Sequence, residues 1–344
     1  MRRIHRRHPP VRAPSARVNL SRLLDEALKR RAGVASAADT NAWRVLHGGA
    51  DGVEGLVLEK HADVLVAQFH EGPQRLPEEQ ARELCAMALR RLGASAVYRK
   101  NFARDRSASV RALEAEHYAA RAWIGADAPE EITVLERGMR FLIRPYDGLS
   151  VGLFLDQRDN RTRVAQTARG ARVLNLFAYT CGFSVAAALG GASETTSVDI
   201  SRRHLEWGKR NFAANGVPLD AQRFIASDAL EYFGRAARQG RAYDLVVLDP
   251  PTFARSKKPA RVFVLEERLE ELFAGAVSVL APGGRILFST NLRALRWARI
   301  EAAARHAAQG RSIRALERCA PLADFHGDER YSRGLILSVA GGAA

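Results

Sequence analysis

The second half of the chain alternates short apolar runs with segments of helical periodicity, and this alternation constrains the fold more than any other feature. Runs rich in β-branched residues predict strands at 171–177, 195–200, 222–225 and 243–248. Apolar residues at helical spacing predict helices between them, at 185–189, 202–214 and 230–238. Strands that alternate with helices form a parallel, doubly wound sheet. We therefore predict an α/β, Rossmann-like fold.

The carboxyl-terminal residues extend this sheet. A helix is predicted over 262–280, and it ends at the Ala281-Pro-Gly-Gly284 turn. Three further strands are predicted after it, at 285–289, 312–318 and 334–339. They complete a seven-stranded sheet whose last pair is expected to be antiparallel.

Polar or turn residues follow each predicted strand, where ligands bind in sheets of this kind. The Asn175 to Phe183 turn contains Gly182 and small residues that let backbone approach a ligand. Asp199 follows Asn175 by about two dozen residues, the spacing at which a carboxylate binds a ribose. The turn has one glycine and no basic residue, which disfavours a nicotinamide dinucleotide and its pyrophosphate. S-adenosylmethionine has no phosphate and fits such a turn.

Two more segments complete a recognisable set of motifs, Gly152 to Arg158 and Asp249 to Lys257. Together with the 175–184 turn, they resemble the class I S-adenosylmethionine-dependent methyltransferases that modify bases of large-subunit ribosomal RNA. The resemblance runs from about Trp43 to the carboxyl end. The Pro251 to Lys257 run and Phe288-Ser-Thr-Asn291 are most similar to the enzymes that make 7-methylguanine, and the cytosine-C5 branch is a close relative.

The resemblance implies an S-adenosylmethionine site built from residues that follow the strands. Its members are Phe154, Asp156, Arg158, Asn175, Phe177, Ala178, Tyr179, Thr180, Gly182, Phe183, Asp199, Ile200, Asp228, Ala229 and Asp249. Asp199 is expected to bind the ribose hydroxyls and Asp228 the adenine amino group. Structural alternatives stay open: Asp228 as a helix cap, and a surface ion pair between Asp156 and Arg158.

Asp249, Pro250 and Phe253 are the candidate catalytic residues. Two prolines restrict the backbone of this loop, which favours catalysis by positioning. We assign Asp249 to orientation of the base and Phe253 to stacking, with loop packing as the alternative for Phe253. Guanine N7 is already nucleophilic, so no general base is required. RNA phosphates are expected to contact three basic residues of the same segment: Arg255, Lys257 and Lys258.

Cytosine C5, in contrast, requires a thiolate that adds to C6. The chain has three cysteines, Cys85, Cys181 and Cys319, and none lies in the 285–291 strand where the cytosine-modifying relatives supply one. This difference favours guanine N7. A non-catalytic RNA-binding protein that retains the fold is the third hypothesis.

Composition agrees with an RNA partner, expected to be 23S rRNA or a large-subunit precursor. The net charge of +15 and pI near 10.5 indicate a polyanionic partner, although an arginine-rich composition also reflects genomic base bias. Three cysteines without zinc or disulfide spacing indicate a reducing cytoplasm and no metal site. No apolar run approaches the roughly 20 residues of a membrane span.

We divide the chain into a basic disordered tail (1–17), a smaller N-terminal α+β domain (18–147) and the methyltransferase domain (148–344). The second part is expected to contain helices at 18–32 and 77–92, and strands at 42–46, 55–59, 63–69, 96–99, 132–136 and 139–145. Residues 148–160 would link the domains. Relatives with a separate RNA-binding module place it before the equivalent of Trp43, where roughly 40 residues are too few. RNA docking is therefore expected from the tail and the small domain.

Overall fold

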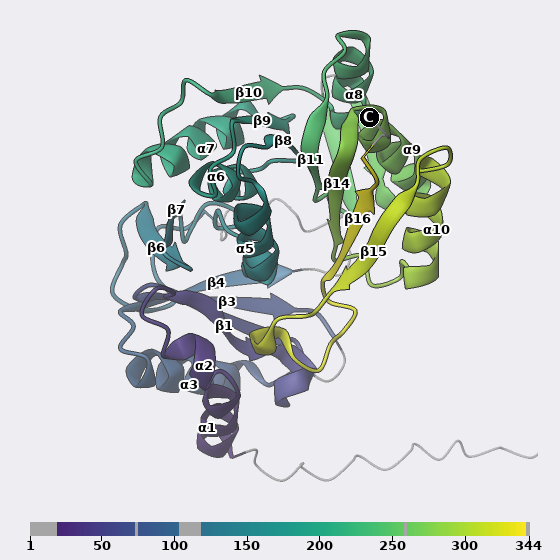
Figure 1. The fold of residues 1–344 in the computed structure, drawn as a ribbon. Coiled ribbons are helices and arrows are strands. Elements are labelled where there is room, and N and C mark those ends of the chain that lie inside the picture. The colour runs from purple at the N-terminus through teal and green to yellow at the C-terminus, as the bar shows by residue number, and fades with distance from the viewer. Residues whose placement is uncertain (1–18, 73–74, 103–117, 258–259, 342–344) are drawn as a thin grey trace, which may run out of the picture.

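Figure 1 shows the computed structural model of the chain, in which two β-sheets lie one above the other. The structure describes residues 19–72, 75–102, 118–257 and 260–341. For residues 255–257 and 260–261 it describes the backbone alone. The expected basic tail and Lys258 lie outside these ranges.

The smaller sheet is built from the amino-terminal part of the chain. Its order is β1-β2-β3-β4-β5, with bounds β1 Ala42–His47, β2 Leu56–His61, β3 Val64–His70, β4 Ala96–Phe102 and β5 Ile124–Gly125. All neighbours are antiparallel except β3 and β4. The core under this sheet is closed by helices α1 (Leu20–Arg30) and α3 (Glu78–Arg91), with a short α2 (Ala32–Ala35) and the 3-10 turn η1 (Gly48–Asp51) beside them. Asn19 caps α1 by accepting a hydrogen bond from the Arg22 amide.

The larger sheet confirms the Rossmann-like prediction. Its order is β10-β9-β8-β11-β14-β16-β15, with bounds β8 Arg172–Leu176, β9 Glu194–Asp199, β10 Gln222–Ala226, β11 Tyr243–Leu248, β14 Leu280–Thr290, β15 Ile313–Cys319 and β16 Arg333–Val339. The first five strands in this order pair in parallel. The expected antiparallel pairing of β15 with β16 is confirmed, and β16 also runs antiparallel to β14.

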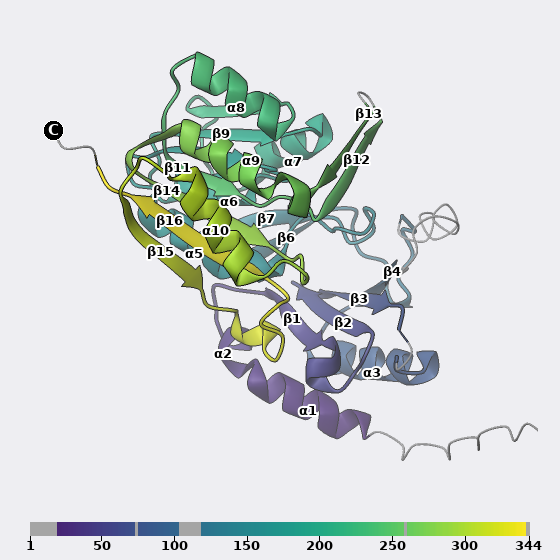
Figure 2. The same cartoon turned by 90° about the vertical axis from the view of Figure 1, so that its right-hand side faces the viewer.

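Helices cover both faces of the larger sheet (Figures 1 and 2). One face packs against α5 (Arg158–Thr167), α6 (Gly182–Leu189) and α7 (Arg202–Ala214). The other packs against α8 (Ala229–Arg238), α9 (Leu265–Ser278) and α10 (Trp297–Ala307). Successive residues of a strand point to opposite faces of the sheet. Val173 packs in the core on the α5–α7 face, and Leu174 packs in the core on the α8–α10 face. Both faces are therefore apolar, as a parallel sheet requires.

Three elements differ from the sequence prediction. Residues 158–160 begin helix α5 instead of linking domains, and α10 is an additional helix. Helix α9 begins at Leu265 because the residues before it form a hairpin, β12 (Phe253–Lys257) with β13 (Ala260–Val264). In Figure 2 this hairpin projects away from the large sheet. Val262, Phe263 and Val264 are β-branched or aromatic and suit the strand that the tertiary pairing forms.

A second hairpin, β6 (Ile132–Glu136) with β7 (Met139–Ile143), packs on helix α7 in the core of the larger sheet. The Leu142 amide donates to Asn211 Oδ1, at 2.8 Å, and Trp207 Nε1 donates to the Leu142 carbonyl, at 3.0 Å. Glycine is required at Gly152, because its φ is +117° and a Cβ there would lie 2.5 Å from Trp207. This hairpin precedes the expected division near Asp147, yet it belongs to the core of the larger sheet on the α5–α7 face.

Hydrogen bonds between two buried ion pairs, Arg158–Asp324 and Arg31–Asp51, and their neighbours join the two sheets. Arg158 on α5 bonds both oxygens of Asp324, at 2.5 and 3.2 Å, in the 3-10 turn η3 (Ala323–Phe325). Asp324 also accepts the Arg44 amide of β1, at 3.0 Å. Its carbonyl accepts from Arg31, which is itself paired with Asp51. Because these groups are almost completely buried, the contacts fix the small sheet against the carboxyl-terminal strands.

Candidate functional site

The turn after β8 is conformationally unusual. Phe177, Tyr179 and Cys181 have φ values of 56°, 48° and 62°, in the left-handed region that residues with a Cβ rarely adopt. Such strain persists only where surrounding contacts impose it, and it is concentrated at functional sites. The predicted cofactor turn is therefore a distinct backbone feature at the carboxyl edge of the sheet.

Side chains from neighbouring elements hold this turn. Asp199, at the end of β9, accepts the Tyr179 amide through Oδ2, at 2.8 Å, and the Ser201 amide through Oδ1, at 2.8 Å. Thr180 Oγ1 donates to the Gly152 carbonyl at 2.6 Å. An ionised carboxylate has about four acceptor positions, so Asp199 retains capacity for ligand hydroxyls.

Several predicted cofactor residues lie beneath the turn. Asn175 Nδ2 donates to Ser184 Oγ at 3.0 Å, and Ser184 lies 2.7 Å from the Ser197 hydroxyl. Ala178, Thr180, Gly182 and Phe183 are also buried. Phe177 packs against Phe263, with ring centroids 5.5 Å apart. For these residues the structure places backbone, not side chain, at the ligand-facing edge.

Exposed apolar side chains surround the same edge. Phe154, Ile200 and Phe253 have exposed fractions of 45%, 57% and 46%, unusually high for large apolar residues. The Phe154 ring lies 5.4 Å from Tyr179 in the turn, and Arg161 holds the Phe154 carbonyl at 2.8 Å. Ile200 directly follows Asp199. Ligand binding over these surfaces would remove apolar area from water.

Asp156 and Asp249 form an electrostatically coupled pair of acids. Burial raises the pKa of Asp249, the hydrogen bond from Ser289 opposes this and the negative charge of Asp156 adds to it, so that the pKa lies at about 6. The Ser289 hydroxyl donates to Asp249 Oδ1. Burial likewise raises the pKa of Asp156, which is bonded to Ser332. Perturbed acids in a cleft are characteristic of functional sites. Pro250, after Asp249, is buried.

Arg158 and Asp228 have structural partners. The surface ion pair considered between Asp156 and Arg158 is absent from the described residues, because Arg158 is buried against Asp324. Asp228 Oδ1 caps α8 by accepting the amides of Leu230 and Glu231, at 2.9 and 3.2 Å. Ala229 begins that helix and is buried.

A cleft of about 730 Å³ separates the two sheets beside the turn. Phe154 and Asp156 line it from the larger unit, together with Asn291, Arg293 and Tyr331. The sequence reasoning missed its opposite wall, which β1 to β3 supply through Arg44, Glu59, Gln68 and His70. Arg44 lies between two rings, 4.1 Å from the centroid of Phe325 and 4.5 Å from that of Tyr331. No local signal marks these residues, because the cleft forms only when both units pack.

The thiols are poor nucleophiles. Burial raises the pKa values of Cys85 and Cys181 to about 12, and it raises that of Cys319 as well. Cys181 lies inside the turn against α7, where a Cβ added to Gly208 would meet its sulfur at 2.3 Å.

Arg255 and Lys257 belong to the β12–β13 hairpin, whose backbone the structure describes. In the described part of the chain, no group of three or more His, Cys, Asp or Glu residues is arranged to hold a metal ion. The described helices include none that is both long and apolar enough to cross a membrane.

The sheet order, the strained turn and the acid after β9 define the class I methyltransferase architecture. A family model for S-adenosylmethionine-dependent methyltransferases matches residues 50–330, so the chain belongs to this family. S-adenosylmethionine is thus its cofactor, and the turn, Asp199 and Ile200 fit it.

Two relatives are named for ribosomal RNA. Ribosomal RNA large subunit methyltransferase K of Neisseria meningitidis is 41% identical over 166 residues, which cover 48% of this chain and 47% of the relative. A ribosomal RNA large subunit methyltransferase of Deinococcus radiodurans is 36% identical over 275 residues, or 79% of this chain and 65% of the relative. The chain thus spans only part of either relative. A methyltransferase solved with SAH superposes with a TM-score of 0.80 at 26% identity, over 95% of this chain and 83% of that one.

Proposed function

We propose that the protein methylates a base of large-subunit ribosomal RNA, with guanine N7 as the acceptor. The observation that carries this proposal is the position of Asp249 and Phe253, which leave β11 at the edge that bears the cofactor turn. The names of the two relatives support ribosomal RNA as the substrate. The net charge of +15 supports a polyanionic partner.

S-adenosylmethionine supplies an electrophilic methyl group. In the proposed reaction the N7 lone pair forms the new N–C bond while the S–C bond breaks, and the base acquires the positive charge. No proton leaves N7, so the protein needs no base. Alignment of the reacting atoms supplies the acceleration, up to several kcal/mol of the barrier. Asp249 would hold the base edge, and Phe253 would stack on the ring.

The cytosine-C5 alternative would need a thiolate at the site. The raised pKa values of Cys181 and Cys319 leave both thiols protonated at neutral pH. This chemistry supports guanine N7 over cytosine C5.

RNA docking is assigned to the small sheet, to the 1–17 tail and to three basic residues of the 253–264 hairpin, Arg255, Lys257 and Lys258. These are proposals from sequence charge. Asp156 and Asp228 are retained as cofactor candidates, whereas for Arg158 we propose positioning of α5 through Asp324. The proposed substrate places the enzyme in the cytoplasm.

The test is nucleoside mass spectrometry of large-subunit RNA and of particles lacking the modification, incubated with S-adenosylmethionine carrying a labelled methyl group. We expect label in 7-methylguanosine with the unaltered protein and a large loss with Asp249→Ala. Asp244→Ala is the matched control, because Asp244 lies near the start of β11 whereas Asp249 directly follows its end. Label in 5-methylcytidine would overturn the N7 assignment, and undiminished turnover of Asp249→Ala would overturn the role of Asp249.

A non-catalytic RNA-binding protein would give a different result. Calorimetry that detected no S-adenosylmethionine binding by the folded protein would favour it. Binding with no methyl transfer to either RNA preparation would instead indicate another substrate.

A further inference from the structure

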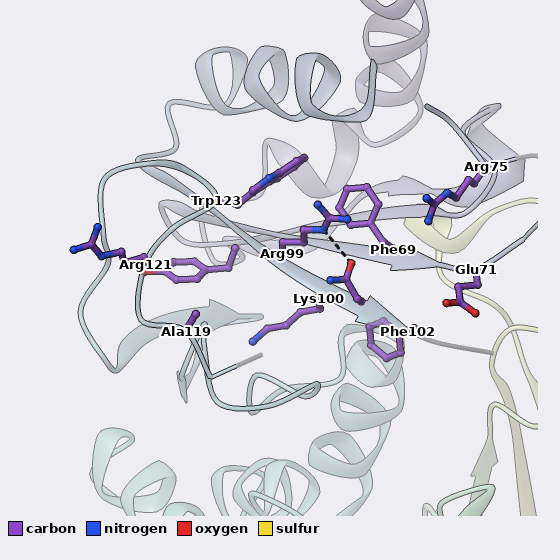
Figure 3. Close-up of a pocket in the computed structure, with 11 residues that line it drawn as sticks. Phe69, Glu71, Arg75, Arg99, Lys100, Phe102, Ala119, Arg121 and Trp123 are labelled. Carbon is purple, nitrogen blue, oxygen red and sulfur yellow. Dashed lines mark hydrogen bonds between the residues drawn. The ribbon is translucent and has the colours of Figure 1, made fainter. Parts of the chain in front are cut away.

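A second cavity, of about 440 Å³, lies on the small sheet beside the part of β4 that β5 does not pair with. β5 pairs only with Ala96 and Val97, so the rest of β4 extends beyond it. Figure 3 shows the cavity, with Arg75 and Arg121 on opposite sides of it and Phe102 at its floor. None of the cofactor or catalytic residues lines it. It is therefore a separate cavity of the small sheet.

The lining combines positive charge with aromatic surface. Among the described residues that line it, four are cationic, Arg75, Arg99, Lys100 and Arg121, and one, Glu71, is acidic. Arg75 and Arg121 are exposed at the rim. A basic surface with aromatic rings is the usual composition of sites for single-stranded nucleic acid.

The aromatic part is held in place by contacts within the small sheet. Arg99 lies 4.6 Å from the Phe69 centroid and 5.4 Å from that of Trp123, and its Nη1 pairs with Glu78 at 2.6 Å. Phe69 and Trp123 meet edge to face, 5.5 Å apart. This wall is preorganised, so a ligand would lose little affinity to ordering it.

The cavity adjoins the cleft of the proposed active site, because Phe102 and Glu71 line both. His70, which lines the cleft, stacks on Phe102 with centroids 4.7 Å apart and an interplanar angle of 22°. A flat ring system placed on Phe102 from the cavity side would extend that stack. An RNA strand with one nucleotide in the cleft would therefore have a neighbouring nucleotide at the cavity.

We propose that this cavity binds a single-stranded RNA nucleotide next to the one to be methylated. Its base stacks on Phe102, and its flanking phosphates contact Arg75 and Arg121. The inference rests on the RNA methyltransferase activity proposed above. It predicts that the target base lies in, or is extruded into, a single-stranded segment, since a duplex would not admit both nucleotides.

The experiment measures the affinity of the full chain for a single-stranded RNA of about 12 nucleotides as a function of salt. Each phosphate contact adds about 0.7 to the slope of log K against log salt. Arg75→Gln combined with Arg121→Gln should therefore reduce the slope by about 1.4 and weaken binding about tenfold. The matched control is Arg238→Gln combined with Arg305→Gln, which removes the same charge from exposed positions on α8 and α10. The control pair should leave the RNA affinity within about twofold of that of the unaltered protein and should leave the salt slope nearly unchanged.

Phe102→Leu separates stacking from charge. We expect it to weaken RNA binding about tenfold while the salt slope stays unchanged. Calorimetric binding of S-adenosylmethionine verifies that each variant is folded. The cavity assignment would be overturned if the Arg75→Gln, Arg121→Gln variant and the Arg238→Gln, Arg305→Gln variant bound RNA with the same affinity and the same salt slope. Absence of methyl transfer to ribosomal RNA by the unaltered protein would count against the proposed function instead.

Discussion

The substitution Asp249→Asn should remove activity and yet stabilise the protein. Burial raises the pKa of Asp249 from 3.8 to about 6, so the folded protein disfavours its ionised form. A shift of this size corresponds to about 3 kcal/mol. Asparagine keeps the oxygen that accepts from Ser289 and carries no charge. The variant should therefore be more stable than the unaltered protein at neutral pH.

The sign of the pH dependence follows from proton linkage. Between pH 3.8 and about 6 the folded protein holds a proton on Asp249 that the unfolded chain has released. The contribution of Asp249 to stability is therefore lost as pH rises through this window. The advantage of Asp249→Asn should be about 1.5 kcal/mol at pH 5 and about 3 kcal/mol at pH 8.

Denaturant unfolding of both proteins at pH 5 and pH 8, without cofactor, measures this difference. Asp244→Asn, in the strand that precedes Asp249, is a control of opposite sign. The hydrogen bond from Arg172 lowers the pKa of Asp244, so asparagine there should destabilise at pH 8 and less so at low pH. Equal or lower stability of Asp249→Asn at pH 8 would refute the assignment of a buried, disfavoured charge at the proposed catalytic centre.

Three further predictions test the construction of the site. Gly208→Ala should weaken S-adenosylmethionine binding in calorimetry and cost about 1 to 3 kcal/mol in unfolding, because its Cβ would displace Cys181 and the turn. Arg158→Met should lower the free energy of unfolding by about 3 to 5 kcal/mol in chemical denaturation, because it leaves Asp324 charged and buried. Adding Asp324→Asn should restore part of this loss, and no restoration would refute the role of the ion pair. Cys181→Ala and Cys319→Ala should each retain methyl transfer and form no covalent complex with 5-fluorocytosine RNA. The cytosine mechanism would be revived if either variant lost methyl transfer and the unaltered protein formed a covalent complex with that RNA.

The sequence by itself determined the class of fold. The runs that end before Phe177, Ile200 and Asp249 are rich in apolar or β-branched residues, and helices of regular period separate them. Local periodicity and turn residues depend on neighbours in the chain, so they can be read without tertiary contacts. The same reading predicted a cofactor site at the 175–183 turn, because its small residues and following acid lie within one strand–helix–strand unit.

Local reading failed where a residue's state depends on distant partners. Val262 to Val264 read as the start of a helix, but pairing with the 253–257 strand makes them β13. The sequence also showed no sign that Arg158 pairs with Asp324, which lies 166 positions further along the chain. The sequence around an arginine or a valine does not indicate which distant residue will contact it.

The tertiary structure alone decided how the site is assembled. It brought Asp156 close enough to Asp249 for their charges to interact, and it placed Arg44 of the small sheet in the wall of the cleft that Asp156 also lines. It also joined the basic cavity to that cleft at Phe102. These arrangements come from packing between two sheets, in which burial and charge are properties of the assembled surfaces and no single segment encodes them.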